Sequence, residues 1–238
     1  MEPGATLIHE ENGSYWHLPH IKATPGTNIA HTYHLKKGKG VDGFKDAEVI
    51  VEGEFLYPLG SCAAIEPHGA IGWFKEDKTI DIWSSSICPF IIREDIAHSY
   101  GVPVADVRVR IPDIGGCFGY KSDITVEQTV AYIASFVPGY PVKWVATRKE
   151  DFTSTLIAHG IRTKMKLGAK KDGTLVAMQT EVIHTGGAYA DTSINVTFAA
   201  TRTASGPYDI PNCDFTGYDV YTNTPPVGAY RGYGHQEG

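Results

Sequence analysis

The sequence is poor in the residues that would crosslink a small fold or bind a metal. Its four cysteines, Cys62, Cys88, Cys117 and Cys213, lie far apart and form no CxxC pair. This spacing argues against both a zinc site and a disulfide framework. We therefore expect reduced thiols, as in a cytoplasmic protein.

Long apolar runs and an excess of positive charge are also absent. No hydrophobic stretch approaches the ~18 residues of a membrane-spanning helix, and Met-Glu-Pro-Gly does not begin a secretory signal. The net charge is −6, with lysines and arginines scattered along the chain. Because nucleic-acid-binding proteins gather basic residues into a patch, nucleic acid is not expected as the main partner. With 42% hydrophobic residues, the chain can form a sizeable core.

Residues 1–45 are rich in histidine, proline and glycine and show weak periodicity. The histidines of this segment are His9, His17, His20, His31 and His34. Their spacing does not match a pair of helical metal ligands, so we expect no metal site among them. We predict an extended linker from a preceding domain for residues 1–45 and one domain for residues 46–238.

From residue 46 onward, strand patterns dominate. Strands are expected at 47–55, 62–65, 70–74, 79–83, 107–111, 141–147, 161–169, 174–184 and 215–221. Helical spacing predicts helices after Pro89 and after Thr125, with a weaker one at 192–204. The charged cluster 148–151 is expected to be a solvated helix start. The fold class is therefore α+β (mixed α/β), a β-rich mixed sheet with two or three helices.

Residues 111–128 have the order strand, glycine-rich turn, helix. The turn contains Gly115, Gly116 and Gly119, and Lys121 follows. Glycines let backbone N–H groups face a ligand that a Cβ would push away, and a helix start adds unpaired N–H groups. This pattern predicts a site for an anionic or strongly polar group, although such a turn can also be purely structural.

A second interpretation of this turn is a phosphate-binding loop. Residues Gly115–Ser122, GGCFGYKS, differ from the pattern G-x-x-x-x-G-K-[ST] at one position. There, Tyr120 replaces the second glycine, and its side chain would obstruct the turn around phosphates. A P-loop-like nucleotide-binding protein therefore ranks as the third alternative.

The last residues, TNTPPVGAYRGYGHQEG, form another candidate site. Arg231 lies between two glycines and is flanked by Tyr230 and Tyr233. A guanidinium can give a forked pair of hydrogen bonds to an oxyanion, and tyrosine rings can clamp a flat substrate. The alternative is an arginine that packs on aromatic rings at the surface.

Three motifs in this order, GEFLYPLGSCAAIEPHGAI, GGCFGYK and TNTPPVGAYRGYG, resemble the molybdopterin-binding large chain of the molybdenum hydroxylases. That family includes xanthine dehydrogenase, aldehyde oxidoreductases and CO-dehydrogenase-like large chains. The likeness runs from about Gly43 to the last residue. It implies a molybdenum–molybdopterin cofactor and the hydroxylation of a carbon with oxygen from water. Iron–sulfur clusters and FAD are expected on partner chains only.

The resemblance also implies site residues. The cofactor-binding residues would be Gly115, Gly116, Cys117, Phe118, Gly119 and Arg231, and the substrate-binding residues Tyr230 and Tyr233. Residues 46–238 would be the first half of the molybdopterin-binding domain, truncated at its C-terminus. The general-base glutamate matches no residue of this chain. The expected partners are the remaining part of the large chain and the iron–sulfur and flavin subunits.

Departures from the family pattern narrow the substrate. Purine-oxidising members have a glutamate where this chain has Ser122, a glutamine near Gly60 and an arginine near Ala199. CO dehydrogenases have a cysteine where this chain has Gly232. The resemblance therefore favours an aldehyde or a small heteroaromatic substrate. A cofactor-free remnant or interaction module on the same fold is the main alternative, because a fold does not fix a function.

Overall fold

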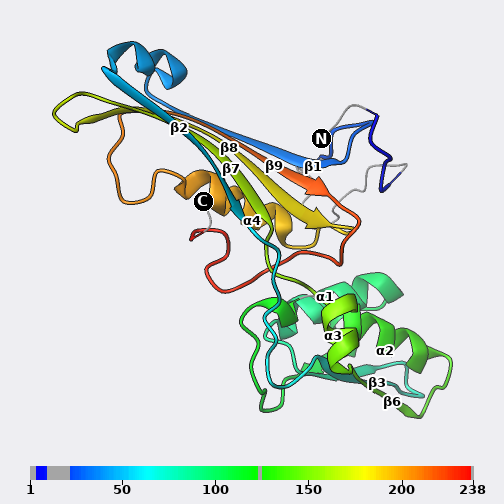
Figure 1. Cartoon of the computed structure of the whole chain (residues 1–238). Coiled ribbons are helices and arrows are strands. Elements are labelled where there is room, and N and C mark those ends of the chain that lie inside the picture. Colours follow the sequence, from blue (N-terminus) through cyan, green and yellow to red (C-terminus); the bar gives the residue numbers. More distant parts are fainter. Residues whose placement is uncertain (1–3, 10–21, 123–124, 237–238) are drawn as a thin grey trace. The chain divides into compact units, whose positions relative to one another are not determined.

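A computed structural model describes residues 4–9, 22–122 and 125–236, and the chain divides into two compact units (Figure 1). Unit 1 comprises Met1–Gly60, Ala158–Val227 and Gly232–Gly238, and unit 2 comprises Ser61–Ile157 and Gly228–Arg231. The sequence pattern predicted one domain for residues 46–238. Hydropathy patterns locate strands but do not say which strands pair, so the division into two sheets was not predicted.

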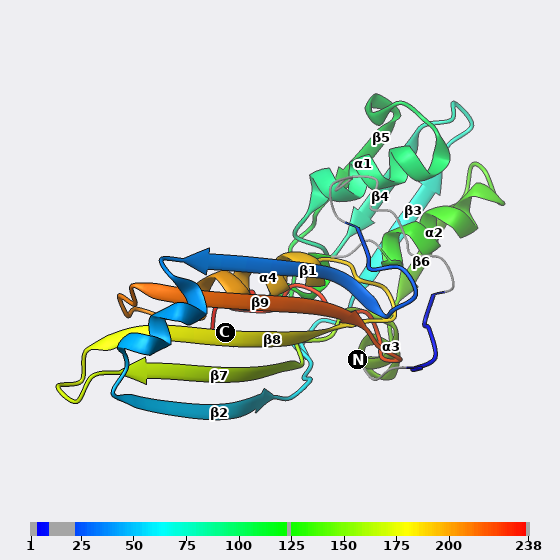
Figure 2. The ribbon, with the colours of Figure 1, turned by 90° about the horizontal axis from the view of Figure 1, so that it is seen from above.

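Unit 1 is built on a five-stranded sheet with the order β1-β9-β8-β7-β2 (Figure 2). Its strands are β1 (Ile29–Lys37), β2 (Val49–Tyr57), β7 (Ile161–Ala169), β8 (Leu175–Gly187) and β9 (Asn212–Tyr221). Within this sheet, β8 and β9 pair in parallel and the other described pairs are antiparallel. Parallel neighbours need a crossover connection, and the helix α4 (Ser193–Thr203) lies within it.

Strand β1 lies inside the segment that was predicted to be a linker. It pairs antiparallel with β9 over its whole length, so this part of residues 1–45 belongs to the sheet. The sequence of β1, IAHTYHLKK, shows little apolar alternation because an edge strand keeps most of its side chains in solvent. His34 Nε2 lies 3.0 Å from Asp214 Oδ1 on β9, whereas His17 and His20 lie outside the described residues.

A buried polar network fastens α4 to the sheet of unit 1. Asp219 on β9 accepts a hydrogen bond from Ser193 Oγ at 2.8 Å and lies 2.9 Å from His184 Nδ1. All three side chains are fully buried. A Cβ on Gly217 would collide with Thr201 Oγ1 of α4, so glycine is needed for the helix to approach the strand.

Unit 2 is built on a four-stranded sheet with the order β5-β4-β3-β6. Its strands are β3 (Gly69–Phe74), β4 (Ile80–Ser84), β5 (Val107–Arg110) and β6 (Pro141–Val145), and its helices are α1 (Pro89–Tyr100), α2 (Thr125–Ser135) and α3 (Arg148–Ser154). A short 3₁₀ helix, η1 (Gly40–Asp46), belongs to unit 1, and two more, η2 (Val104–Asp106) and η3 (Tyr120–Ser122), belong to unit 2. The α+β class is confirmed.

Two local predictions differ from the structure. The described residues contain four α-helices, one more than the upper number expected, because the charged cluster 148–151 opens the short helix α3. The strand expected at 62–65 is not formed. Ala63 has a φ of 45°, a left-handed backbone that interrupts extended structure. In the part of the chain that the structure covers, every helix is too short or too polar to cross a bilayer.

Asp81 on β4 makes the stability of unit 2 dependent on acidity. Its nearly buried carboxylate contacts Lys75 Nζ at 2.8 Å and Arg110 Nη1 at 3.0 Å. Burial alone would raise the pKa of Asp81, but the two cations outweigh it and hold the pKa below its ordinary value, which is about 4. A depressed folded pKa stabilises the protein above the unfolded pKa, and this contribution is lost as the pH falls through the folded value.

We therefore expect the melting temperature of the wild type to decrease as the pH is lowered below about 4. In Asp81→Asn the same decrease should be smaller. Thermal melts followed by near-UV circular dichroism at a series of pH values measure this. Asp113→Asn, at an exposed position of the same unit, is the control. Parallel pH profiles for the wild type and Asp81→Asn would contradict the assignment.

Candidate functional site

The glycine-rich segment of unit 2 forms a loop with an unusual backbone. Left-handed conformations occur at Gly116, Phe118 and Gly119, with φ values of 105°, 56° and 106°. For a non-glycine residue such a conformation costs about 1–3 kcal/mol and is held only where the surroundings fix it. The ring of Phe118 is 51% exposed while Cys117 is buried, so the loop carries one side chain outward and the next inward.

The same loop presents backbone donors. Among the described residues, no hydrogen bond uses the N–H groups of Gly116, Cys117, Phe118 or Gly119. Unpaired backbone N–H groups require a partner such as water or a ligand, and successive N–H groups in mixed right- and left-handed backbone form concavities for anions. The loop is therefore a candidate receptor for an oxyanion or another electron-rich group.

The second candidate segment meets this loop within unit 2. A Cβ placed on Gly119 would lie 2.7 Å from Ala229 O and 3.0 Å from Tyr230 N. Glycine is therefore required for this contact. Gly228 N donates to Ile157 O at 3.3 Å, which ties the segment to the end of the same unit. Two motifs that are far apart in the sequence thus come together, backbone against backbone.

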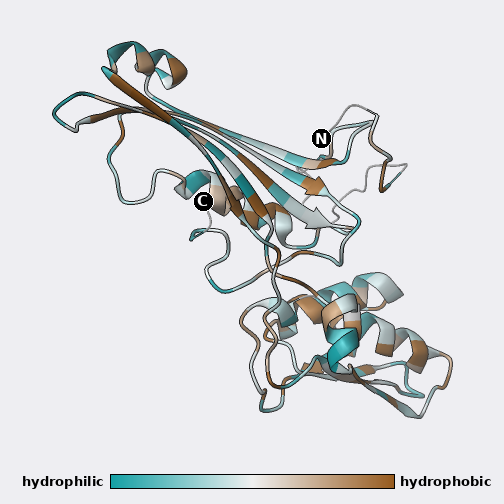
Figure 3. Ribbon diagram, in the orientation of Figure 1, coloured by the Kyte–Doolittle hydropathy of each residue, from teal (hydrophilic) through white to brown (hydrophobic). Residues whose placement is uncertain are grey.

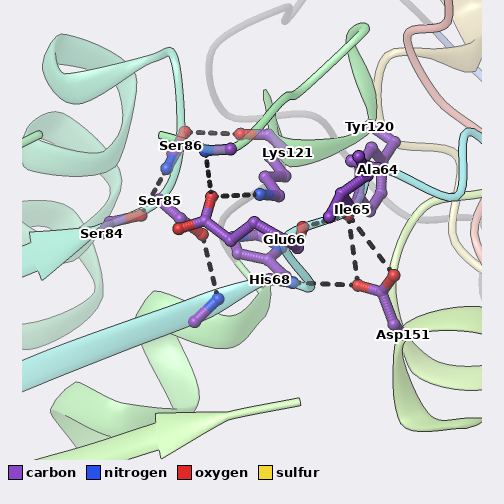
Figure 4. Close-up of polar contacts among 12 residues, drawn as sticks. Ala64, Ile65, Glu66, His68, Ser84, Ser85, Ser86, Tyr120, Lys121 and Asp151 are labelled. Carbon is purple, nitrogen blue, oxygen red and sulfur yellow. Dashed lines mark hydrogen bonds and ion pairs between the residues drawn. The ribbon is translucent and has the colours of Figure 1, made fainter. Parts of the chain in front are cut away.

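Glu66, from the EPHG corner before β3, contacts residues at both ends of the loop (Figure 4). Its Oε2 accepts hydrogen bonds from Lys121 Nζ at 2.7 Å and from Gly115 N at 2.9 Å. Burial would raise the pKa of Glu66, but the bonds from Lys121 and Gly115 outweigh it and lower the pKa below its ordinary value. Glu66 is therefore an ionised support for both ends of the glycine-rich segment.

The position of Lys121 bears on the phosphate-loop alternative. In a P-loop the lysine must reach the nucleotide phosphates. Here the Lys121 side chain is fully buried and its ammonium contacts Glu66, and the ring of Tyr120 is also buried. This lysine supports the loop from beneath, which disfavours nucleotide binding.

A second layer of polar contacts lies under the loop. Asp151 on α3 is buried and accepts hydrogen bonds from Arg148 Nη1 at 2.7 Å and His68 N at 3.0 Å (Figure 4). Arg148 Nη2 donates to the carbonyl oxygens of Ala64 and Ile65 at 2.5 and 2.9 Å. The expectation of a solvated cluster at 148–151 was therefore wrong for Asp151, because charge composition alone does not reveal which carboxylate meets buried donors.

Tyr120 and Cys62 line the interior of this region as neutral groups. Burial, followed by the nearby Asp151 carboxylate, raises the pKa of Tyr120, whose hydroxyl lies 3.3 Å from Glu66 O. Burial also raises the pKa of the Cys62 thiol to about 12. None of the four cysteines, all in the described part of the chain, forms a disulfide. The described residues also contain no cluster of three or more His, Cys, Asp or Glu side chains arranged for a metal ion.

Sequence analysis did not single out Glu127 on α2. Its carboxylate is fully buried, lies 3.1 Å from His68 Nε2 and accepts a hydrogen bond from Ser84 Oγ. Glu127 lies three residues before the buried Val130 and so on the same face of the helix. A glutamate at a helical position that faces the apolar side was the feature of the sequence that could have indicated its burial. The network links α2 to Ser84 on β4 and to His68, the residue before β3.

The predicted site residues fall into two groups. Gly115, Gly116, Cys117, Phe118 and Gly119 lie in one loop of unit 2, and Tyr230 and Arg231 belong to the same unit. Tyr233 belongs to unit 1, where burial, Asp219 and Tyr233 itself raise the pKa of Tyr33 to about 12. The binding roles of these residues remain predictions.

Comparisons with known proteins agree with the three motifs. A family model described as "Molybdopterin cofactor-binding domain" matches residues 21–238. The nicotinate dehydrogenase large molybdopterin subunit of Eubacterium barkeri is 33% identical over 208 residues, which cover 87% of this chain and 49% of that protein. A probable hypoxanthine oxidase of Escherichia coli strain K12 is 33% identical over 218 residues, covering 92% of this chain and 23% of that protein.

Solved structures show the same relationship. The aldehyde oxidoreductase from Desulfovibrio gigas matches with a TM-score of 0.82 at 30% identity, over 88% of this chain and 23% of that one. The chain therefore spans about half the length of the first of these relatives and about a quarter of the others.

Proposed function

Because this chain belongs to the molybdopterin cofactor-binding domain family, we propose that it forms one part of the catalytic large chain of a molybdenum hydroxylase. The observation that carries this proposal is the contact of Gly119 with the backbone of Ala229 and Tyr230. It joins the two family motifs, GGCFG and AYRG, within one unit.

The loop fits the cofactor of this family. The N–H groups of Gly116, Cys117, Phe118 and Gly119 donate to no acceptor in the described part of the chain and are suited to electron-rich ligand atoms. When bound, the molybdenum centre supplies Lewis acidity and accepts electrons. This chain's own residues supply preorganised donors from the loop and positive charge from Arg231, which stabilise negative charge where water is excluded. Glu66 and Lys121 keep the loop in place.

We propose an aldehyde or a small heteroaromatic compound as the substrate. Ser122 stands where purine-oxidising members have glutamate, and Gly232 stands where CO dehydrogenases have cysteine. The relative from Eubacterium barkeri is named for nicotinate, a heteroaromatic acid. Tyr230, in unit 2, is the residue proposed to stack on the flat surface of the substrate, and a substrate-binding role for Tyr233 stays a prediction of the family resemblance.

We further propose that activity requires the remaining part of the large chain. The curated relatives are up to several times longer than the matched segment, and no residue of this chain matches the family's general-base glutamate. The relative from Eubacterium barkeri is itself named as one subunit of a larger enzyme. Iron–sulfur and flavin subunits are the partners proposed for electron transfer.

The test compares the purified chain with a complex that contains the rest of the large chain, each supplied with molybdenum cofactor. We expect molybdenum to be retained in the complex and aldehyde oxidation to be at least ~10²-fold faster than for the chain alone, because a missing general base costs ~10²–10⁴ in rate. Elemental analysis and a steady-state assay measure the two quantities.

Three outcomes separate the alternatives. Equal activity of the chain alone would refute the requirement for a second part. Absence of molybdenum from the complex would favour the cofactor-free module. Calorimetric titration with ATP is expected to give no binding, and measurable affinity would instead support the nucleotide alternative.

A further inference from the structure

Strand β2 of unit 1 has one face without charges, which carries Val49, Val51 and Phe55, and one mixed face, on which Glu52 and Glu54 lie between Ile50 and Leu56. Val49, Val51 and Phe55 are 45%, 57% and 60% exposed, and Figure 3 colours the beginning of β2, next to η1, as hydrophobic. Alternation with a period of two is typical of a strand with one face intended for burial. In this chain that face is open.

The apolar face of β2 lies on the same side of the sheet as α4. Val51 pairs with Leu167, and Gly53 pairs with Met165 on β7; directly opposed residues share a face. Met165 and Leu167 pack against a buried cluster that includes Ala204, at the end of α4. On the other face of β2, Glu52 Oε1 lies 2.8 Å from Lys166 Nζ of β7.

One helix is too narrow to cover this sheet. Neighbouring strands are about 4.8 Å apart, so five strands span about 19 Å between the outer axes, whereas a helix with its side chains is about 10 Å wide. Helix α4 contacts β1, β8 and β9. At the start of β7, Ile161 packs with Ala200 of α4 in a buried cluster. The rest of β7 together with β2 leaves room for about one further helix.

A groove of about 460 Å³ lies on this uncovered part, beside the end of α4. Its lining is mostly apolar: Met165, Leu167, Leu175, Met178, Ala204, Ser205, Gly206, Tyr208 and Ile210. Tyr208 is 65% exposed at its margin. The ring of Phe55 lies over Gly53, which faces Met165 across the strand pair. The groove and the apolar face of β2 thus form one surface, here termed the β2–β7 face.

We propose that the β2–β7 face binds an amphipathic α-helix from the remaining part of the large chain, laid beside α4. This inference rests on the proposed function. The matched segment is 49% of the Eubacterium barkeri subunit, so a comparable length of the large chain is available to supply the helix. A second copy of this chain is a poorer occupant. Pairing along the β2 edge would extend the sheet and leave its apolar face uncovered.

Site-specific photocrosslinking tests the proposal on the protein isolated with its native partners. Phe55 on the apolar face and Leu56 on the opposite face are consecutive residues of β2, and both are exposed. Each is replaced in turn by p-benzoyl-phenylalanine. We expect crosslinks from position 55 to a peptide of the remaining large chain, identified by mass spectrometry, and none to that peptide from position 56.

The other outcomes overturn the proposal. These are crosslinks from position 55 to a second copy of this chain or to an iron–sulfur or flavin subunit, equal crosslinks from both positions, or none. Molybdenum content is measured in the same sample. Molybdenum without the crosslink overturns this inference alone, whereas the crosslink without molybdenum overturns only the cofactor role.

A pair of neighbouring substitutions provides an independent measure. Val51→Lys places a charge on the β2–β7 face, and Glu52→Lys places one on the opposite face of the same strand. We expect Val51→Lys to weaken binding of the purified remaining part by about 10- to 100-fold and Glu52→Lys to leave it within about 3-fold. Misfolding of β2 would affect both variants, whereas equal losses in well-folded variants would contradict the proposal.

Discussion

Glu66→Gln is expected to destabilise unit 2 more than Lys121→Met, although both changes break the same ion pair. The Lys121 side chain is 0% exposed, while that of Glu66 is 37% exposed. Removing the negative charge leaves a fully buried ammonium without a counter-charge, which costs about 3–5 kcal/mol. This is a large part of the ~5–15 kcal/mol that stabilises a typical domain.

The converse change is milder because Glu66 has other partners. In Lys121→Met, the carboxylate keeps its bond from Gly115 N and its contact with water, and we expect a loss of about 1–2 kcal/mol. The double variant Glu66→Gln/Lys121→Met should be more stable than Glu66→Gln, since it removes the isolated charge. The order of stability of the three variants thus follows from the burial of Lys121 and the partial exposure of Glu66.

Urea denaturation followed by tryptophan fluorescence measures these differences. Trp73, Trp83 and Trp144, three of the four tryptophans of the chain, lie in unit 2. Lys149→Met, at an exposed position on α3, controls for the loss of a lysine. A Glu66→Gln variant that is as stable as Lys121→Met would show that the buried ammonium is satisfied in another way.

Gly119→Ala is expected to separate the two motifs and to abolish retention of molybdenum cofactor. Alanine at a φ of 106° is strained, and its Cβ would overlap Ala229 O. Left-handed strain of about 1–2 kcal/mol and overpacking of about 1–3 kcal/mol together predict a loss of about 2–5 kcal/mol. Because the carbonyl of Ala229 is backbone, it can yield only by displacing the segment that carries Arg231.

Gly101→Ala provides a matched control in the same unit. Gly101 follows α1 with a φ of 61°, and a Cβ there would meet no atom within 4 Å. This variant therefore carries left-handed strain without a collision, and we expect a loss of about 1 kcal/mol and unchanged molybdenum content. Urea denaturation and elemental analysis of the complex are the two measurements. Equal molybdenum loss in both variants would argue against a site at the Gly119 contact.

The local sequence pattern predicted a strand or helix correctly where the burial of one face of that segment determines its structure. The alternation in β2, β7 and β8 and the helical spacing of α1 and α2 predicted those elements, because period-two and period-3.6 burial are properties of a short stretch of sequence. The family resemblance, carried by three short motifs, is confirmed by the family model that matches residues 21–238. Glycine spacing at residues 115–119 also indicated a loop with special backbone geometry, and such geometry is present.

Prediction was weaker where the outcome depends on a distant partner. The polar strand β1 is ordered by pairing with β9, and the expected strand at 62–65 is interrupted at Ala63. Asp151 and Glu127 are of residue types that usually lie at the surface. Both are nevertheless buried and accept hydrogen bonds from residues outside their own helices. Residue type alone does not reveal burial when the compensating group lies on another segment.

The amino-acid sequence by itself determined most of the strands and helices, the order of the motifs and the family. Only the tertiary structure decided that residues 228–231 leave the unit of their sequence neighbours and lie against Gly119, that Lys121 turns toward Glu66, and that one face of β2 is left open. The physical reason is that these contacts join segments far apart in the chain, and their selection depends on the packing and charge compensation of the whole unit.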